Sequence, residues 1–381
     1  MMIEGIQREV IRRFDFGGEV IECSVYGSGH INDTFRLTVR GEDGSVRRFI
    51  LQRMNRSIFT EPEELMENIS GVTNWLKKKI RENGGDPERE TLSLVNTTDG
   101  KPYYKDSEGE YWRVYLFIEN ATSYDQVEDE NDFYQSAVAF GRFQGLLADY
   151  PAQTLHETIK NFHNTVDRFA KFQAAVERDV CGRAKDVQEE IRFVQEREAL
   201  AHRLCDLQEI GELPLRLTHN DTKLNNIMID DDTGKAICVI DLDTVMPGLS
   251  VNDFGDSIRF GASTGAEDER DLSKVSCDLR LYEVYVKGFI EGCGGALTER
   301  ELDCLPDGAI LMTFECGMRF LTDYLEGDTY FKIHREGHNL DRCRTQIKLV
   351  ADMEEKYSRT RQTHECILQL SSVQISKITN L

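Results

Sequence analysis

One polar stretch decides the fold of this chain. Residues 218–229 read Thr-His-Asn-Asp-Thr-Lys-Leu-Asn-Asn-Ile-Met-Ile, and residues 239–243 read Val-Ile-Asp-Leu-Asp. Apolar residues on either side of the polar part predict short buried strands around 215–217, 227–229 and 237–240. The sequence between the last two strands, Asp-Asp-Asp-Thr-Gly, consists of residues that favour tight turns. We therefore expect a polar loop between buried strands, with Asp241 at the end of the last one.

The polar residues of this stretch are the types that phosphoryl transfer to a hydroxyl requires. That reaction needs a carboxylate that takes the hydroxyl proton, a neutral oxygen ligand for Mg²⁺, and a second carboxylate that joins the metal to the phosphates. Asp221, Asn226 and Asp241 can supply these groups in this order. Each residue alone would fit a polar loop over a core, but their order and spacing favour a site of phosphoryl transfer.

The spacing His-x-Asp-x-x-x-x-Asn at 219–226 resembles the catalytic segment of protein kinases and their small-molecule relatives. It is more similar to the aminoglycoside phosphotransferase and choline kinase superfamily. Within that superfamily, the segments HNDTKLNN and CVIDLDTVMPG resemble those of the N-acetylhexosamine 1-kinases. The resemblance implies a protein-kinase-like α+β fold with an antiparallel β small lobe and a mainly helical large lobe. We expect residues 1–119 to form the nucleotide-binding lobe, and 120–381 to form the large lobe with the catalytic loop and substrate site.

The resemblance also implies roles for the residues of the loop. Asp221 would be the catalytic base, Lys223 would contact the transferred phosphate, and Asn226 would hold the metal ion. Asp241 would be the main carboxylate ligand of Mg²⁺, and Asp243 would support that ion or bind a second one. ATP and Mg²⁺ are the expected cofactors.

A second group of residues is expected to hold this loop in shape. His219 matches a family position with that task. Either Asp253 or Asp256 would receive the backbone N–H groups of the loop.

The amino-terminal residues predict a strand at 20–26, a short glycine loop, and strands at 34–40 and 46–54. Glycines let a backbone approach phosphates closely. A pair of glycines alone usually marks a hairpin, but its place upstream of the catalytic loop favours a phosphate lid. The residues expected to contact the nucleotide here are Gly27, Ser28, Gly29, His30, Asn32 and Thr34.

The strand at 46–54 contains no lysine that could meet the nucleotide phosphates. Arg53 falls where the choline kinase-like strand carries its cation, so the resemblance gives it that role, while Gln52 alternates to the other face. The helix expected at 61–83 resembles the one that pairs an acidic residue with this cation, and Glu67 or Glu64 would be that residue.

Two further groups of contacts follow from the resemblance. The strand that ends near Ile118 and Glu119 would lie beside the adenine. Arg319 is a charge within an apolar helical run, and a buried arginine needs either an acidic partner in the core or a place in a cleft. In the N-acetylhexosamine 1-kinases an Arg and a Tyr at matching positions contact the sugar, so Arg319 and Tyr330 would bind substrate together with Asp221.

The composition excludes other classes of protein. The formal net charge is −22, which argues against the basic surface that binding to nucleic acids or anionic membranes requires. The ten cysteines form no Cys-x-x-Cys pair, which favours reduced thiols over a zinc site. No apolar run is long enough to span a bilayer, and the start lacks a signal-peptide pattern, so we expect a cytoplasmic monomer or homodimer.

The expected activity is ATP-dependent phosphorylation of the anomeric hydroxyl of an N-acetylhexosamine, and three alternatives remain open. A choline-type kinase needs an aromatic cage, but both tryptophans, Trp75 and Trp112, fall in the expected small lobe. A kinase for an aminoglycoside would need an acidic cleft, but the substrate-side segment mixes its acids with basic residues such as Arg319, Lys332 and Arg335, which favours a neutral polyol. Another small alcohol such as homoserine stays open as the acceptor. An inactive nucleotide-binding module is disfavoured because the residues needed for catalysis are all present.

Overall fold

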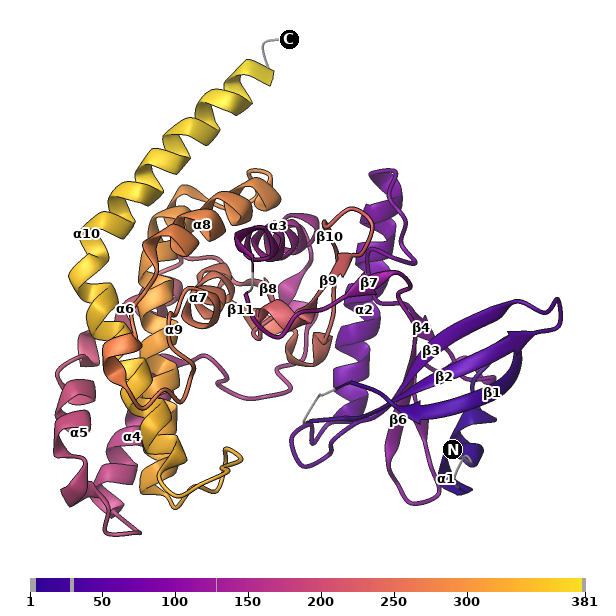
Figure 1. Cartoon of the computed structure of the whole chain (residues 1–381), viewed down its shortest axis with the longest axis horizontal. Coiled ribbons are helices and arrows are strands. Elements are labelled where there is room, and N and C mark those ends of the chain that lie inside the picture. Colours follow the sequence, from indigo (N-terminus) through magenta and orange to yellow (C-terminus); the bar gives the residue numbers. More distant parts are fainter. Residues whose placement is uncertain (1–4, 28–30, 128, 379–381) are drawn as a thin grey trace. The chain divides into compact units, whose positions relative to one another are not determined.

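The computed structural model describes residues 5–27, 31–127 and 129–378, and the chain divides into two compact units (Figure 1). The smaller unit consists of residues 1–122, 154–159 and 228–246, and the larger unit of residues 123–153, 160–227 and 247–381. Two segments that follow residue 119 in the sequence thus pack with the amino-terminal part. The lobe boundary expected at residue 119 remains a prediction.

The smaller unit is built on an antiparallel sheet with the strand order β1-β2-β3-β6-β4, in which β5 also pairs with β6. A second sheet has the order β10-β9-β7. The elements are α1 (Gly5–Ile11), β1 (Gly18–Val25), β2 (Asp33–Gly41), β3 (Val46–Arg53), α2 (Pro62–Glu82), β4 (Leu94–Val95), β5 (Tyr104–Lys105), β6 (Tyr111–Leu116), β7 (Ala121–Thr122), β9 (Ile227–Asp230) and β10 (Ala236–Val239).

The two faces of the main sheet have different environments because side chains alternate along each strand. On β3, Phe49 and Leu51 are buried with Trp112 and Val114 of β6, and this cluster packs against Phe14 and other residues at and after α1. The intervening residues of β3, which include Gln52, project from the opposite face. That opposite face carries the polar network described below.

Helix α2 has the apolar stripe that its sequence predicts. Leu65, Ile69, Val72 and Leu76 recur at helical spacing and are all buried. Pro62 occupies the first turn, where its missing N–H would have no partner within the helix. The helix follows the prediction of 61–83 to within one residue at each end.

The larger unit is mainly helical. Its elements are α3 (Glu130–Leu146), α4 (Thr165–Arg178), α5 (Gln188–Gln195), α6 (Glu198–Glu209), β8 (Arg216–Thr218), β11 (Met246–Gly248), α7 (Ser250–Gly261), α8 (Leu279–Cys293), α9 (Glu299–Leu325) and α10 (His338–Ile378), with short 3₁₀ turns at Ala152–Thr154, Ala184–Asp186, Leu224–Asn226 and Leu272–Lys274. The chain is interrupted between α5 and α6, where Arg197 pairs with Glu354 of α10.

Helix pairs in the larger unit pack closely through glycines. A side chain on Gly255 of α7 would collide with the backbone of Gly308 on α9, and a side chain on Gly308 would collide with Val251 of α7. The buried residues on α7 include Asp253 and Asp256. This close approach therefore fixes the helix that supports the catalytic loop.

The fold class predicted from the sequence is confirmed, with an antiparallel β sheet in the amino-terminal unit and helices in the rest. No helix in the described parts of the chain is long and apolar enough to cross a membrane.

Candidate active site

The predicted catalytic loop of the larger unit follows β8, and one buried carboxylate binds its backbone. Asp253 of α7 accepts the backbone N–H of His219 at 2.9 Å and that of Asn220 at 2.8 Å, and the side-chain amide of Gln144 at 2.9 Å. Burial raises the pKa of Asp253, and the backbone hydrogen bonds act in the opposite direction. Of the two acids considered for this support, Asp253 is the one that binds the loop backbone ahead of Asp221.

His219 fixes the turn that presents Asp221. Its ring is fully buried and lies edge-on to Phe140 and Phe143, with centroids 5.4 and 6.0 Å away. Its Nδ1 accepts the backbone N–H of Asp221 at 3.3 Å. Asn220 lies between them in the left-handed region, with φ of 64°, a conformation that asparagine tolerates better than most residues. The histidine thus supports the loop without contributing a reactive group.

The carboxylate of Asp221 lies between two other predicted site residues. Lys223 approaches its Oδ1 at 2.6 Å, and the side-chain amide nitrogen of Asn226 donates to its Oδ2 at 3.2 Å and to its backbone oxygen at 2.8 Å. The amide oxygen of Asn226 takes part in neither hydrogen bond. The structure therefore brings the three predicted catalytic residues together in one loop.

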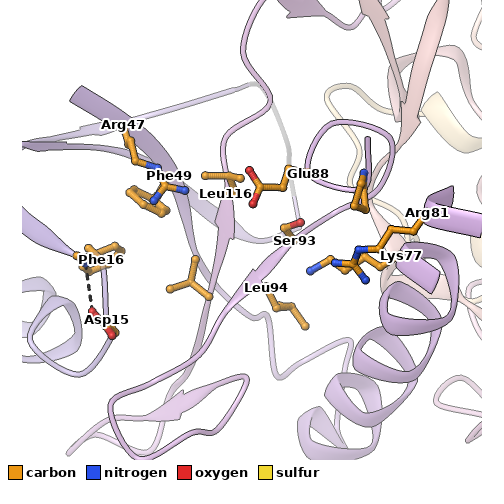
Figure 2. Close-up of a pocket in the computed structure, with 13 residues that line it drawn as sticks. Asp15, Phe16, Arg47, Phe49, Lys77, Arg81, Glu88, Ser93, Leu94 and Leu116 are labelled. Carbon is orange, nitrogen blue, oxygen red and sulfur yellow. Dashed lines mark hydrogen bonds between the residues drawn. The ribbon is translucent and has the colours of Figure 1, made fainter. Parts of the chain in front are cut away.

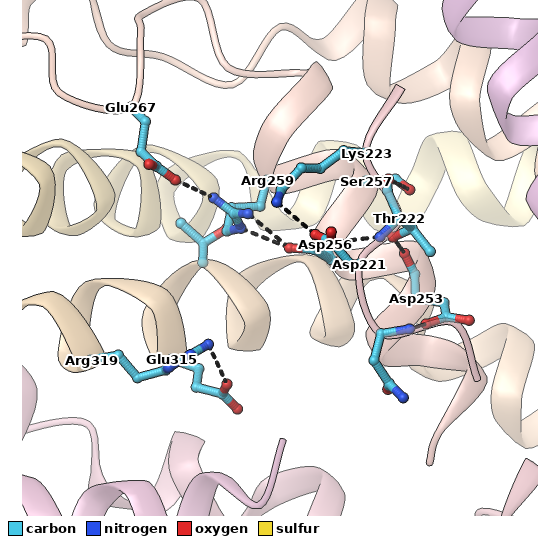
Figure 3. A network of polar contacts seen from close by, with 12 residues as sticks. Asp221, Thr222, Lys223, Asp253, Asp256, Ser257, Arg259, Glu267, Glu315 and Arg319 are labelled. Carbon is cyan, nitrogen blue, oxygen red and sulfur yellow. Dashed lines mark hydrogen bonds and ion pairs between the residues drawn. The ribbon is translucent and has the colours of Figure 1, made fainter. Parts of the chain in front are cut away.

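A chain of charged residues extends from Lys223 within the larger unit (Figure 3). Asp256 accepts the backbone N–H of Thr222 at 3.2 Å and pairs with Arg259 at 2.9 Å, and Arg259 pairs with Glu267 at 3.1 Å. Burial acts to lower the pKa of Lys223, but Asp221 and Asp256 outweigh it and raise that pKa. Lys223 is therefore held as an ammonium group beside Asp221.

The predicted metal segment lies in the smaller unit, after β10. Asp241 adopts a left-handed conformation, with φ of 57°, and a 3₁₀ turn at Leu242–Thr244 follows it. Within that turn the Asp243 carboxylate is almost fully buried and forms an ion pair with Arg113 of β6, at 2.5 and 2.8 Å. Its Oδ2 also accepts the side-chain amide of Asn32 at 2.7 Å.

The geometry of loop and segment agrees with the comparison of the sequence with known families. Residues 22–283, more than half of the chain, match the phosphotransferase enzyme family. The chain belongs to this family. It is accordingly a small-molecule kinase of the aminoglycoside phosphotransferase and choline kinase type.

Solved structures of other phosphotransferases share the fold. An aminoglycoside phosphotransferase from Alicyclobacillus acidocaldarius is 12% identical, with a TM-score of 0.56 over 96% of this chain and 98% of its own. A choline kinase from Cryptosporidium parvum is also 12% identical, with a TM-score of 0.53 over 92% of both chains. A microcompartment-associated aminopropanol kinase is 15% identical, with a TM-score of 0.52 over 89% of this chain and 93% of its own.

The phosphotransferase has a cation beside its metal segment that the sequence analysis missed. Gln52 of β3 lies directly opposite Arg113 in the register of the sheet, and its side chain accepts two hydrogen bonds from that guanidinium, at 3.0 and 2.9 Å. Burial acts to lower the pKa of Arg113, but the Asp243 carboxylate outweighs it and raises that pKa. The sequence did contain a signal for this cation, because Arg113 is a charged residue in the middle of the otherwise apolar strand Tyr111–Leu116.

Arg53, to which the phosphate contact was assigned, lies on the other face of β3 from Gln52. Its side chain is 44% exposed and pairs with Asp33. Glu67, its expected acidic partner, pairs instead with His156 at 2.7 Å. The phosphate contact of Arg53 and the role of Glu67 remain predictions.

The other residues expected around the nucleotide are placed as follows. Gly27 has φ of 77°, in the region that favours glycine, whereas Ser28, Gly29 and His30 lie outside the described residues. Thr34 accepts a hydrogen bond from Gln52 at 3.1 Å. After β6, Ile118 is buried and Glu119 pairs with Arg48.

Arg319 is surrounded by aromatic rings in the larger unit. Its guanidinium carbon lies 5.5, 5.9 and 5.4 Å from the ring centroids of Phe162, Tyr330 and Phe331, so both predicted substrate residues belong to one cluster. Tyr330 is 65% exposed. The acidic partner anticipated for Arg319 is Glu315, one helical turn away at 3.8 Å (Figure 3).

Glu315 and His163 link this cluster to the catalytic loop, and the sequence analysis missed both. Glu315 is fully buried and contacts Nδ1 of His163 at 2.9 Å, while Nε2 of His163 lies 3.4 Å from the backbone oxygen of Asn220. Burial acts to raise the pKa of Glu315, but His163 and Arg319 outweigh it and lower that pKa. Only the tertiary structure joins these residues, because they come from distant parts of the chain.

Proposed function

We propose that this phosphotransferase transfers the γ-phosphoryl group of ATP to the anomeric hydroxyl of an N-acetylhexosamine. The observation that carries the choice of acceptor is the cluster around Arg319. Three aromatic rings that could receive a quaternary ammonium already surround the chain's own cation. A cationic acceptor such as choline would meet like charge there, whereas a neutral sugar would not.

The polar groups of the cluster suit a neutral acceptor with hydroxyl and amide groups. Arg319 can donate to hydroxyl or carbonyl oxygens. The Oε2 atom of Glu315 is buried and has no hydrogen-bond partner among the described residues, so it can accept a hydroxyl or amide hydrogen. Arg168 is a further arginine close to this cluster, and burial together with the charge of Arg319 lowers its pKa. An N-acetylhexosamine offers the donors and acceptors that these groups need.

The proposed reaction is direct in-line transfer, without a covalent intermediate on the protein. Asp221 would accept a hydrogen bond from the acceptor hydroxyl and take its proton. Lys223 would turn from Asp221 to the transferred phosphate and offset its charge. The charge chain from Asp256 to Glu267 would keep Lys223 protonated in either position.

The residues proposed to hold Mg²⁺ offer only oxygen donors, which this ion prefers. They are Asp241 and the amide oxygen of Asn226. Among the described residues no group of three or more His, Cys, Asp and Glu side chains could hold a metal, which fits an ion that takes most of its ligands from phosphates and water. When bound, Mg²⁺ would neutralise charge on the phosphates. Asp243 would act through Arg113 to fix the segment, since that pair occupies its carboxylate.

A phosphorylation screen tests the proposal. The purified protein is incubated with ATP, Mg²⁺ and, in turn, free hexoses, N-acetylhexosamines, choline, homoserine and aminoglycosides. We expect turnover with an N-acetylhexosamine and a product that is no longer a reducing sugar, with phosphorus NMR showing a 1-phosphate. A reducing product would carry its phosphate elsewhere and would refute the site of transfer. Turnover with choline or an aminoglycoside alone would refute the choice of acceptor.

A matched pair of variants tests the role of Arg319. Losing one hydrogen bond to a charged group costs about 1.5–3 kcal/mol, or roughly ten- to a hundredfold in kcat/KM. Arg319→Ala should therefore lower kcat/KM for the sugar by that factor, while the background hydrolysis of ATP stays near that of the wild type. The control is Arg335→Ala, because Arg335 pairs with Asp268 and Asp341 and has no contact with the aromatic cluster. If kcat/KM for the sugar fell equally in the two variants, the assignment of Arg319 to the acceptor site would be refuted.

A further inference from the structure

The smaller unit contains a cavity of about 420 Å³ whose lining does not belong to the proposed active site (Figure 2). Its walls come from β3, the carboxyl-terminal half of α2, β4, the end of β6 and the segment that precedes β1. A volume of this size lies within the range of small-molecule sites.

The cavity opens on a different face of the sheet from the Arg113 network. Arg47 and Phe49 line it, and they alternate along β3 with Gln52, which contacts Arg113. Leu116, another lining residue, lies opposite Phe49 in the sheet register. A ligand in this cavity would therefore not compete with Arg113 or Asp243 for the same space.

Three cations surround the cavity in a chain whose net charge is −22. Arg47, Lys77 and Arg81 form no ion pair with any carboxylate in the described part of the chain. Figure 2 shows Lys77 and Arg81 next to each other on α2. Many of the other cations pair with acids, so a cavity lined by three unpaired cations is unusual for this surface.

The two acidic residues of the cavity do not neutralise these cations. Asp15 accepts the backbone N–H of Gly17 at 3.1 Å. Burial and then the charge of Arg81 lower the pKa of Lys77, and the charge of Glu88 only partly offsets this lowering. A bound anion would relieve the repulsion between Lys77 and Arg81.

Apart from Ser93 and Gly17, the remaining lining residues are apolar. Phe16 and Phe49 are 6% and 3% exposed, and their rings meet edge to face at 5.1 Å. Leu94 and Leu116 add aliphatic surface beside them. Such a lining favours a ligand that joins an anionic group to a ring or another apolar part.

We propose that this cavity is a second ligand site, which binds an organic phosphate monoester with its phosphate beside Lys77 and Arg81 and its apolar part against Phe49. Arginine forks and lysine are the usual protein partners of phosphate groups. The proposal does not depend on which acceptor the kinase uses.

Binding of phenyl phosphate to the full-length protein, measured by isothermal titration calorimetry, tests the site. We expect saturable binding that is tighter than the binding of inorganic phosphate, because the ring adds apolar contact. Lys77→Gln should weaken the binding of phenyl phosphate about tenfold or more, as expected for the loss of a charged hydrogen bond. The matched control is Lys78→Gln, the same change one position along α2, because Lys78 is 70% exposed and pairs with Glu82 rather than lining the cavity.

Circular dichroism and the melting temperature confirm that both variants are folded. Unchanged affinity in Lys77→Gln, or equal loss in Lys77→Gln and Lys78→Gln, would overturn the proposal. Absence of saturable binding to the wild type would overturn it as well. Equal affinity for phenyl phosphate and inorganic phosphate would refute the apolar half of the site.

Discussion

Replacing Arg113 with methionine tests the buried ion pair beside the metal segment. The side chains of Arg113 and Asp243 are only 1% and 4% exposed, and their atoms approach at 2.5 and 2.8 Å. Methionine keeps much of the apolar length of arginine but removes the charge. The Asp243 carboxylate would then be buried without its ion-pair partner, and of its two partners Arg113 and Asn32 only the Asn32 amide would still donate a hydrogen bond to it. Removing one partner of a buried pair costs about 3–5 kcal/mol, because it leaves an uncompensated charge.

The control is Arg53→Met, the same substitution on the neighbouring strand. The ion pair of Arg53 with Asp33 is exposed, with side chains 44% and 54% accessible, so its loss should cost only about 0–1 kcal/mol. The double variant Arg113→Met/Asp243→Leu should recover most of the loss, since apolar residues of similar size can replace a buried pair with little penalty.

Urea unfolding followed by tryptophan fluorescence is the assay. Both tryptophans, Trp75 and Trp112, belong to the smaller unit, so the signal reports on the unit that contains the ion pair. The midpoint and slope of the transition give the change in the free energy of unfolding. Equal losses in Arg113→Met and Arg53→Met, or a double variant less stable than Arg113→Met, would refute the reasoning.

Three further predictions concern the reaction and the dependence of stability on pH. Asp221→Asn should abolish transfer but preserve the binding of ATP measured by calorimetry, because it removes the proton acceptor and keeps its shape; a near-normal kcat would exclude Asp221 as the base. Asp241→Ala should weaken Mg²⁺-dependent binding of ATP, and equal affinity for Mg·ATP in variant and wild type would exclude it as the main ligand. Burial acts to raise the pKa of Glu301, but Arg216, at 2.6 Å, outweighs it and lowers that pKa below 4.5. Its stabilising contribution is therefore complete above about pH 4.5 and is lost as the pH falls through the lower folded-state pKa, so Glu301→Gln should show a shallower loss of unfolding free energy in acid than the wild type. Parallel acid-unfolding curves would contradict this assignment.

The catalytic loop was predictable because its residues are neighbours in the sequence. Asp221, Lys223 and Asn226 lie within six positions, so their contacts depend on one local turn rather than on the packing of distant elements. The strand alternation of β3 and the apolar stripe of α2 were readable for the same reason. These local patterns were enough to predict the fold class.

The cation beside the metal segment was not predictable in this way. Sequence reasoning assigned a phosphate contact to Arg53 and gave no role to Arg113, which the structure places against Asp243 from a different strand. Register decides this contact, because β6 brings Arg113 opposite Gln52 and on the same face. A strand read alone shows that a charge lies within it but not which partner it meets.

The sequence alone therefore determined the family and the fold class, and it predicted the loop that carries Asp221, Lys223 and Asn226, because these depend on spacing along the chain. Only the tertiary structure decided that Asp243 is paired with Arg113, that Arg319 lies among three rings, and that Arg47 and Lys77 line one cavity. Each of these contacts joins residues far apart in the chain. Their partners are set by sheet register and helix packing, which spacing along the sequence does not encode.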